Sequence, residues 1–441
     1  MRPTFPSTLL RGHDLSVAAV RFAPGPTPGS LLTWGDDAQP RFWRIPDALA
    51  DPVVLRAAVR PLVMGMAVSP DGRWVASSSL GDSKLVLWSI QDAGARPREL
   101  PVPGYARSIA FSADGPWLAA KSQDQGQISL WSLRDLTRAP VVLVEDDSSD
   151  DQTLRFSPDS RWLASGTKGD RRPPLLDLWD VSGEGPSLEP RHRCRPPSHV
   201  REIAFSSDAK LMATAAQDRT ARVWNLAAAN PCTGPIELPH GDAGNVVYQL
   251  TISSDARWAA GASMDGKGRL WDLKAGPQPK LMREVTFGDR VFRAVFSPDN
   301  RWVAFGSWDR TAALLDLRNA GSAAPIRLTG HVGRILAAGF SPDGRWLATA
   351  GEDRTLRLWD PAAPDAAPIV LRGHEAAVPH IGFTADGRWL VSAAYDGTVR
   401  QWRLRLEDLV QDACTTAGRQ LLGSEIERYL GASAAVGSDR V

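Results

Sequence analysis

The chain has 441 residues, and its 51 Lys and Arg residues against 50 Asp and Glu residues give a net charge of +1. That balance excludes nucleic acid and anionic membranes as partners held by overall electrostatic attraction. With 23% charged and 43% hydrophobic residues, the composition is typical of a folded globular protein and excludes a disordered chain.

The cysteine pattern bears on the compartment. Cys194, Cys232 and Cys414 are far apart in the sequence, odd in number and without a C-x-x-C pair. We therefore expect neither a disulfide framework nor a zinc site, and a cytoplasmic, reducing location. No run of apolar residues is long enough to span a bilayer, so we expect no membrane segment.

An internal repeat runs through most of the chain. The phrase Ser-Pro-Asp-Gly-Arg-Trp recurs, whole or decayed, at intervals of about 44 residues. Its copies lie at residues 69–74, 112–117, 157–162, 206–211, 253–258, 297–302, 341–346 and 384–389. A degenerate copy near residues 22–31 precedes them and makes nine repeats. This period is typical of the four-stranded blade of a β-propeller and excludes the shorter helical repeats.

Each repeat predicts short strands separated by turns. In the repeat at 335–360, Leu336, Ala338 and Phe340 alternate with small residues before a Pro-Asp-Gly turn. The pattern then predicts a buried strand at 346–350 and an alternating one at 356–359. Residues 8–10 form a predicted strand ahead of the first repeat. We expect this strand to pair with the last one, near 398–403, and to close a ring.

Two dipeptides recur at fixed places in the repeats. Gly-His pairs lie at 12–13, 330–331 and 373–374, and Trp-Asp pairs lie at 179–180, 271–272 and 359–360. With these motifs the sequence resembles the WD40-repeat family across residues 7–404. The resemblance implies an all-β propeller domain over residues 1–404. A single nine-bladed ring is favoured, and seven or eight blades stay open because propellers usually have about four to eight.

By that resemblance, three histidines belong to buried polar networks, each with an Asp, a hydroxyl residue and a Trp. The sets are His13, Thr33, Asp37 and Trp43; His331, Thr349, Asp353 and Trp359; and His374, Ser392, Asp396 and Trp402. A buried indole N–H needs an acceptor, and each linked group satisfies the next.

The other histidines and repeat seven depart from this pattern. In repeat seven, Phe287, Phe305 and Leu315 occupy the His, hydroxyl and Trp positions. Joint replacement is expected, because a half-satisfied buried network is worse than none. The remaining histidines have no spacing typical of metal ligands, and we expect them in loops or at the surface: His192, His199, His240 and His380.

Repeat four is irregular in two loops that the WD40 resemblance places on one face, the top. The loop before its first strand contains Asp146, Asp147, Asp150 and Asp151, and its second loop contains Arg171 and Arg172. The loop that leads to the next repeat contains Arg191, Arg193 and Arg195. We expect these loops to lie close together. They form either a charge-patterned docking site for protein or ion pairs without that role.

Four large side chains fall outside the repeated Trp positions and are candidates for partner binding: Trp308, Tyr395, Met264 and Trp34. The first three directly precede turn aspartates, and Trp34 lies near the same rim. Partly exposed aromatic and Arg side chains suit protein interfaces. Packing against a neighbouring blade is the alternative.

After residue 404 the apolar period becomes helical. Leu409, Val410 and Ala413 share one helical face, and residues 424–427 predict the capping box of a second helix. We therefore expect a helical appendix at 405–431 and a disordered tail at 432–441. The appendix resembles the tail that follows WD40 arrays in bacterial multidomain signalling proteins. It is expected either to cap the propeller or to dock a partner.

No motif in the chain predicts chemistry. We find no P-loop, G-x-S-x-G elbow or H-E-x-x-H motif, and most Asp residues fall in turns. We expect no enzyme activity, no cofactor and no metal. The favoured function is a scaffold for protein partners in bacterial signalling or defence. Those partners would be a larger complex or an effector such as a protease, kinase, NTPase or transcription factor.

Two alternatives to the scaffold remain. The chain could be an inhibitory or sequestering subunit of such an effector. It could also be a propeller enzyme or small-ligand binder, which would need convergent polar residues near the ring axis. The first alternative differs from a scaffold in whether removal of the chain releases or silences the activity of its partner.

Overall fold

The structure, a computed structural model, describes residues 7–404 with gaps. Within that range it does not describe residues 11–12, 14, 24–29, 38–39, 45–52, 55–62, 72, 80–82, 90–95, 105, 114–115, 123–125, 145–152, 168–172, 184–185, 241–245, 277, 323 and 385. The predicted helical appendix at 405–431 and the predicted tail at 432–441 lie outside the described residues and stay predictions.

The strands form four-stranded antiparallel sheets that follow one another along the chain, and we number these blades from one to nine. Blade one contains β2 (Val17–Ala23), β3 (Ser30–Gly35), β4 (Arg41–Arg44) and β5 (Val53–Val54). Blade two contains β6 (Val63–Val68), β7 (Trp74–Ser79), β8 (Lys84–Ser89) and β9 (Arg98–Pro101). Blade three contains β10 (Ala106–Phe111), β11 (Trp117–Ser122), β12 (Gln127–Ser132) and β13 (Val141–Val144).

The next three blades repeat this order. Blade four contains β14 (Leu154–Phe156), β15 (Trp162–Gly166), β16 (Leu176–Asp180) and β17 (His192–Cys194). Blade five contains β18 (Val200–Phe205), β19 (Leu211–Ala216), β20 (Thr220–Asn225) and β21 (Ile236–Pro239). Blade six contains β22 (Val247–Ile252), β23 (Trp258–Ser263), β24 (Lys267–Asp272) and β25 (Lys280–Thr286).

The last three blades include the strand from the start of the chain. Blade seven contains β26 (Val291–Phe296), β27 (Trp302–Ser307), β28 (Ala312–Asp316), a 3₁₀ turn η2 (Leu317–Asn319) and β29 (Ile326–Leu328). Blade eight contains β30 (Ile335–Phe340), β31 (Leu347–Gly351), β32 (Leu356–Trp359) and β33 (Ile369–Leu371). Blade nine contains β34 (His380–Phe383), β35 (Trp389–Ala393), β36 (Val399–Arg403) and β1 (Ser7–Leu10).

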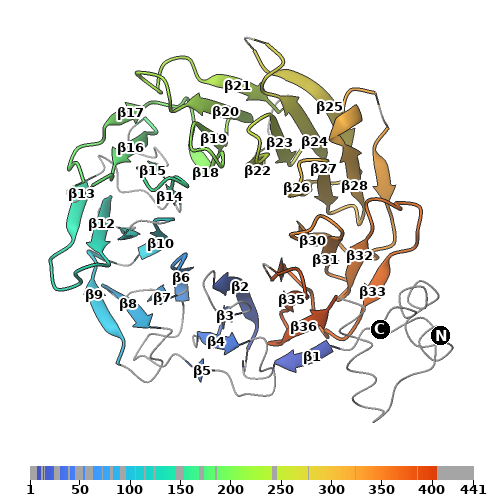
Figure 1. Cartoon of the computed structure of the whole chain (residues 1–441), viewed down its shortest axis with the longest axis horizontal. Helices are drawn as coiled ribbons and strands as arrows, with labels where there is room; N and C mark the ends of the chain where they lie inside the picture. The colour runs from blue at the N-terminus through green and yellow to red at the C-terminus, as the bar shows by residue number, and fades with distance from the viewer. Residues whose placement is uncertain are drawn as a thin grey trace, which may run out of the picture.

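The blades stand side by side in a closed ring, with the first strand of each nearest the axis and the last at the outer rim (Figure 1). Neighbouring strands are antiparallel, so the start of each inner strand and the turn between the second and third strands lie on one face, the top. The nine predicted repeats are therefore nine blades of one ring, and the all-β propeller prediction is confirmed.

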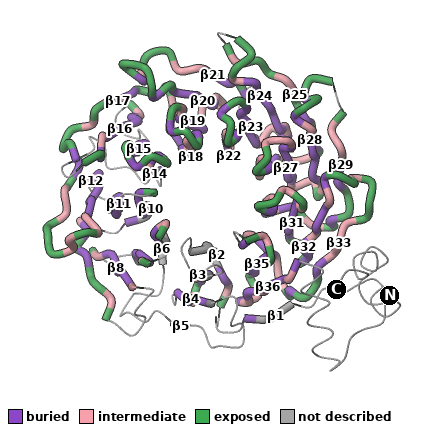
Figure 2. Tube along the Cα trace, viewed as in Figure 1, coloured by how far each residue is buried: buried purple, intermediate pink, exposed green. Residues whose placement is uncertain are grey.

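Buried residues lie along the strands and exposed ones mainly in the turns and outer loops (Figure 2), and apolar clusters join neighbouring sheets. One cluster joins Trp302 and Leu314 of blade seven to Ile335 and Leu347 of blade eight. The second strands β11, β23 and β27 are buried along their whole length, because a blade covers each of their faces. Burial of this apolar surface stabilises the ring by about 25 cal/mol per Å².

The first strand closes the ring. β1 pairs antiparallel with β36, with Leu10 opposite Val399, and supplies the outer strand of blade nine. This is the pairing that the sequence predicts. Leu10 is buried with Val17 of blade one and Val391 of blade nine. Backbone hydrogen bonds and a shared apolar cluster thus hold the seam together.

The repeated phrase forms the turn between the first and second strands. In blade seven the Ser297 hydroxyl donates to Asp299 at 2.5 Å and accepts the backbone N–H of Trp302 at 2.9 Å. The fourth residue of the phrase has a positive φ, which is 70° at Gly344 and 54° at Asn300. Glycine adopts this conformation without a Cβ clash, which explains its place in the phrase.

Candidate functional site

The polar network of blade eight ties a top loop to the core. Trp359 Nε1 donates to Thr349 Oγ1 at 2.9 Å, and that hydroxyl lies 2.8 Å from His331 Nε2. His331 Nδ1 lies 2.8 Å from Asp353 Oδ2, in the turn between β31 and β32. These contacts fit the tautomer in which Nδ1 carries the proton and donates to the carboxylate.

Blades nine and one contain the same network. In blade nine the distances are Trp402 Nε1–Ser392 Oγ 2.9 Å, His374 Nε2–Ser392 Oγ 2.8 Å and His374 Nδ1–Asp396 Oδ2 3.2 Å. In blade one they are Trp43 Nε1–Thr33 Oγ1 2.8 Å, His13 Nε2–Thr33 Oγ1 2.8 Å and His13 Nδ1–Asp37 Oδ1 2.9 Å. The three sets contain the residues expected from the sequence and lie in consecutive blades around the closure seam.

The carboxylates of the blade-eight and blade-nine networks stay ionised. Burial works to raise the pKa of Asp353, but hydrogen bonds from His331 and Thr355 outweigh burial and hold that pKa far below its usual range. The pKa of Asp396 is lowered against burial in the same way, chiefly by the hydrogen bond from His374. Carboxylates in this state accept hydrogen bonds and hold their turns, and they take up no proton near neutral pH.

Blade six replaces the network with a stacked histidine. His240 precedes β22 and has no exposed surface. Its Nδ1 lies 2.9 Å from Leu238 O, and its ring centroid lies 4.6 Å from that of Trp271. A Cβ at Gly261 would lie 2.0 Å from His240 Nε2, so the missing side chain makes room for the ring. Burial lowers the pKa of His240 to about 4.

The remaining histidines were expected in loops or at the surface, and His240 does lie in a loop, but it is fully buried there. His199, in the loop before β18, is also buried. His192 on β17 and His380 on β34 are half-buried. The sequence feature that could have predicted the burial of His240 is Gly261, which occupies the position of Thr349 in blade eight and leaves space for a ring.

Blade seven contains the apolar set expected from the sequence. Phe287, Phe305 and Leu315 are buried in one cluster with Leu270 of blade six. A Cβ at Gly268 would lie 2.5 Å from the Phe305 ring, so glycine on β24 accommodates the larger side chain. Both glycines lie in blade six, where Gly261 makes room for His240 and Gly268 makes room for Phe305 of blade seven.

Five side chains from three blades meet on the top face, and we call them the rim cluster: Tyr248, Arg290, Phe292, Trp308 and Arg334. The ring centroids of Tyr248 and Phe292 are 5.5 Å apart, and those of Phe292 and Trp308 are 5.6 Å apart. The guanidinium carbons of Arg290 and Arg334 lie 5.1 and 4.8 Å from the Trp308 ring centroid. Trp308 is thus flanked by two cations.

The sequence singled out Trp308 but missed its aromatic neighbours. Tyr248 and Phe292 are each the second residue of an inner strand, at an irregularity in the pairing of that strand with the next. Such a bulge re-aims a side chain toward the rim. Recurrence of aromatic residues at that position is the signal that could have found them.

Three exposed apolar side chains lie on the top of the neighbouring blades. Val332, before β30, is 77% exposed, Tyr395, in the turn after β35, is 54% exposed, and Leu15, before β2, is 55% exposed. A Cβ at Gly397 would lie 2.7 Å from Leu15 O, so the Tyr395 turn packs closely on the Leu15 loop. The other two aromatic-rim candidates, Met264 and Trp34, are half-buried.

The predicted gathering of charges around blade four is only partly visible. Asp146, Asp147, Asp150, Asp151, Arg171 and Arg172 lie outside the described residues. Arg193 lies on β17, the outer strand of blade four, and Arg191 directly precedes that strand, whereas Arg195 lies in the expected loop that leads to blade five. Arg193 makes two hydrogen bonds to the buried carboxylate of Asp177, at 2.9 and 3.0 Å. Arg191 and Arg195 are exposed.

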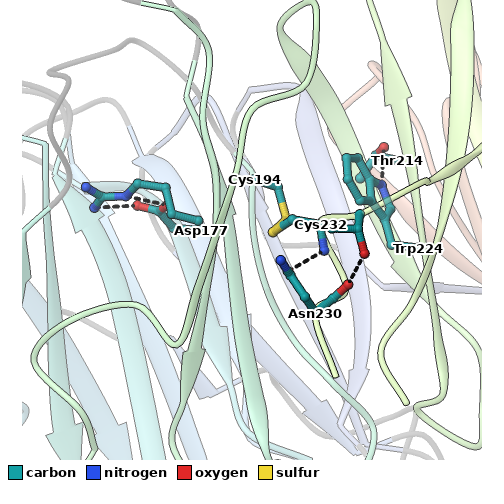
Figure 3. Close-up of a disulfide and its surroundings, with 8 residues drawn as sticks. Asp177, Cys194, Thr214, Trp224, Asn230 and Cys232 are labelled. Carbon is teal, nitrogen blue, oxygen red and sulfur yellow. Dashed lines mark hydrogen bonds and ion pairs between the residues drawn. A yellow bond between two sulfur atoms is a disulfide. The ribbon is translucent and has the colours of Figure 1, made fainter. Parts of the chain in front are cut away.

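The prediction of no disulfide is wrong. Cys194 on β17 is bonded to Cys232 in the loop between β20 and β21, across the joint between blades four and five (Figure 3). The two residues are 38 positions apart, and no local spacing motif connects them. Only the fold brings them together.

Two further searches cover the described part of the chain alone. No set of three His, Cys, Asp or Glu side chains there is arranged to hold a metal ion. Among the helices described, none is long and apolar enough to cross a membrane.

A scan against protein-family models matches the WD domain, G-beta repeat, model (WD40) to six segments: 54–89, 189–225, 236–272, 284–316, 325–360 and 368–403. These segments fall on blades two and five to nine, and the structure gives the same four-stranded form to blades one, three and four. No curated protein matches the chain significantly.

Proposed function

The chain belongs to the WD40-repeat β-propeller family, whose repeats generally mediate protein–protein interaction, and we propose that it is a non-catalytic scaffold that binds partner proteins through its top face. The observation that carries this proposal is the concentration of aromatic, apolar and Arg side chains on the top of blades six to nine and blade one. Such side chains provide most of the binding energy in protein interfaces.

The rim cluster and the exposed residues beside it have the composition of an interface centre. Trp308 contributes a large apolar surface, while Arg290 and Arg334 lie against it with their planar cations. Stacking of this kind limits the conformations of both Arg side chains, so less entropy is lost when a partner binds them. Val332 and Tyr395 extend the apolar area toward blade nine.

The proposal is tested with Trp308→Ala and Tyr395→Ala, and with Leu281→Ala as a matched control on the outer strand β25. Leu281 is 47% exposed and lies away from the top face. We expect each top-face variant to weaken partner capture from the native host about tenfold or more, and the control to leave it unchanged. Capture that is equal for all three variants would rule out the top face as the binding surface.

The bacterial signalling or defence setting and an effector partner of the protease, kinase, NTPase or transcription factor class are part of the proposal. They are supported by the resemblance of residues 409–429 to the tail of bacterial signalling proteins. An inhibitory role would appear as increased partner activity when the gene is deleted, whereas a scaffold role would appear as lost activity. A cytoplasmic location is at odds with the Cys194–Cys232 bond, because cytosolic proteins rarely keep disulfides.

A further inference from the structure

A covalent bond crosses the joint between blades four and five. Cys194 ends β17 at the outer rim of blade four, and Cys232 lies in a loop of blade five (Figure 3). We propose that this pair is an oxidative modification site. Its two thiols are joined by a disulfide-bearing oxidant, and the protein matures in an oxidising compartment.

The turn that carries Cys232 is held by bonds that do not involve sulfur. Cys232 N donates to Asn230 Oδ1 at 3.0 Å, and the Thr233 hydroxyl donates to Asn230 O at 2.9 Å. Gly234 follows with a φ of 64°, which lets the chain reverse. The Cα atoms of Cys194 and Cys232 are 4.9 Å apart, within the range that a disulfide spans without backbone movement. The turn therefore presents Cys232 to its partner.

The bond lies where blade four is least supported by its own strands. The inner strand β14 and the outer strand β17 have three residues each, whereas β18 and β21 of blade five have six and four. Shorter strands form fewer ladder hydrogen bonds and bury less surface against the next blade. Cys194 also belongs to the apolar cluster of this joint, with Leu178, Val200 and Trp224. The disulfide thus clamps the short edge of blade four to blade five.

The exposure of the two cysteines determines the order of the chemistry. Cys232 is half-buried and Cys194 is 1% exposed, so an oxidant reaches Cys232 first. The Cys232 thiolate attacks the S–S bond of the oxidant, which forms a mixed disulfide and releases one oxidant thiol. The Cys194 thiolate then attacks Cys232 Sγ and releases the second. The protein loses two S–H bonds and gains one S–S bond, and the oxidant takes up two electrons and two protons.

The compartment follows from this chemistry. Disulfides form and persist where the environment is oxidising, and cytosolic thiol systems keep such pairs reduced. Once formed, the bond is shielded on the Cys194 side by buried apolar residues, which limits attack by external thiols. A mature protein with this bond is therefore expected outside the reducing cytosol.

The first test is a thiol count on the full chain isolated from its native host. Cells are quenched in acid, free thiols are alkylated, disulfides are reduced and the released thiols receive a second label before peptide mass spectrometry. We expect Cys194 and Cys232 to carry the second label. A sample that is reduced and denatured before the first alkylation should carry only the first label. Both cysteines carrying the first label in most molecules of the test sample would overturn the proposal.

The second test measures the clamp itself. Reduction of the purified wild-type chain should lower its melting temperature by about 4 °C, as expected for a loop of 38 residues in a chain of this size. The double variant Cys194→Ala/Cys232→Ala should melt at the lower temperature with or without reductant. If that variant fails to fold, the wild type with and without reductant gives the same comparison. An unchanged melting temperature after verified reduction would contradict the clamp.

Discussion

His240 makes folding of blade six sensitive to acid. Burial lowers its pKa to about 4, whereas the same ring in an unfolded chain has a pKa of about 6.5. As pH falls below 6.5 the unfolded chain takes up a proton that the folded chain excludes, so stability is lost down to about pH 4. We expect His240 to account for a loss of about 2 kcal/mol in the free energy of unfolding between pH 7 and pH 5.

The measurement is urea unfolding at both pH values for the wild type and for His240→Gln. The variant should be less stable at pH 7 because the Trp271 stacking is lost, but its stability should change less between the two pH values. The difference between the two pH dependences isolates this ring from the other titrating groups. Equal pH dependences for both proteins would show that His240 titrates normally.

Thr349 is the residue that links two members of the blade-eight network. Replacement by Val keeps the shape of the side chain but removes the hydroxyl that accepts from Trp359 Nε1 and contacts His331 Nε2. Two buried polar atoms then lack their partner, and we expect Thr349→Val to cost about 2 kcal/mol by denaturant unfolding. Thr251→Val on β22, a half-buried site outside any network, should cost under about 0.5 kcal/mol. Equal costs would argue against the network.

At the level of single residues, the resemblance to WD40 repeats predicts which side chains hydrogen-bond to one another within one repeat. The sets around His13, His331 and His374 were expected from the resemblance to WD40 repeats, and the structure shows their hydrogen bonds. The burial of His240 could not be predicted in that way, because it depends on the absence of a side chain at Gly261. A contact in which a ring fills the space left by a glycine does not recur at a fixed sequence spacing, so a repeat pattern does not reveal it.

Among the elements, the repeated turn offers a simple stability test. Ala256 holds the left-handed position of the blade-six turn with φ 53°, where blade eight has Gly344 at 70°. A Cβ in that conformation costs about 1–2 kcal/mol, part of which the greater flexibility of unfolded glycine offsets. We therefore expect Ala256→Gly to stabilise the protein by about 0.5–1 kcal/mol.

Thermal unfolding monitored by circular dichroism checks this turn prediction. The control is Ala259→Gly on β23, where the residue is buried in an extended strand and the same change should destabilise. Destabilisation by both substitutions would mean that the positive φ at the turn carries no strain.

The element boundaries of blade four show where the sequence was insufficient. The sequence predicts a loop from Arg191 to Arg195, but residues 192–194 form the outer strand β17. That strand is short and lacks the apolar alternation on which strand prediction rests, since it reads His-Arg-Cys. Its pairing partner β16 and the bond to Cys232 define it, and both are tertiary contacts.

For the whole molecule, stability should depend on the seam. Leu10 is 3% exposed and packs against residues of blades nine and one. We expect Leu10→Ala to cost about 3 kcal/mol, because it leaves a cavity in the apolar cluster that joins blade nine to blade one. Leu15→Ala, at an exposed site in the next loop, should cost under about 0.5 kcal/mol.

Calorimetry distinguishes a loss at the seam from a loss in one blade. In a closed ring each blade packs against a blade on both sides. Leu10→Ala should therefore lower the midpoint temperature of one cooperative unfolding transition. If blade nine were held independently, the variant would instead show a separate early transition while the main one stayed in place.

The architecture was predictable because it is repeated. The repeat is recognisable across its nine copies even where a single copy has diverged. The predicted strand of residues 8–10 has no preceding blade in the sequence, so it is expected to pair with the last blade. Docking surfaces are the opposite case, since they depend on departures from the repeat such as Tyr248 and Phe292. These two aromatic residues occupy the same position in only two of the nine repeats, so the repeated phrase does not predict them.

The pairing of β1 with β36 places Ser7 opposite Trp402, so both ends of the ring-forming segment share one sheet. A circular permutant, with the native ends joined near β1 and β36 and new ends placed between two other blades, would contain the same nine blades in the same ring. The order of the blades along the chain therefore determines which blades are adjacent, but no particular blade has to come first. Circular permutants of the chain are expected to fold alike.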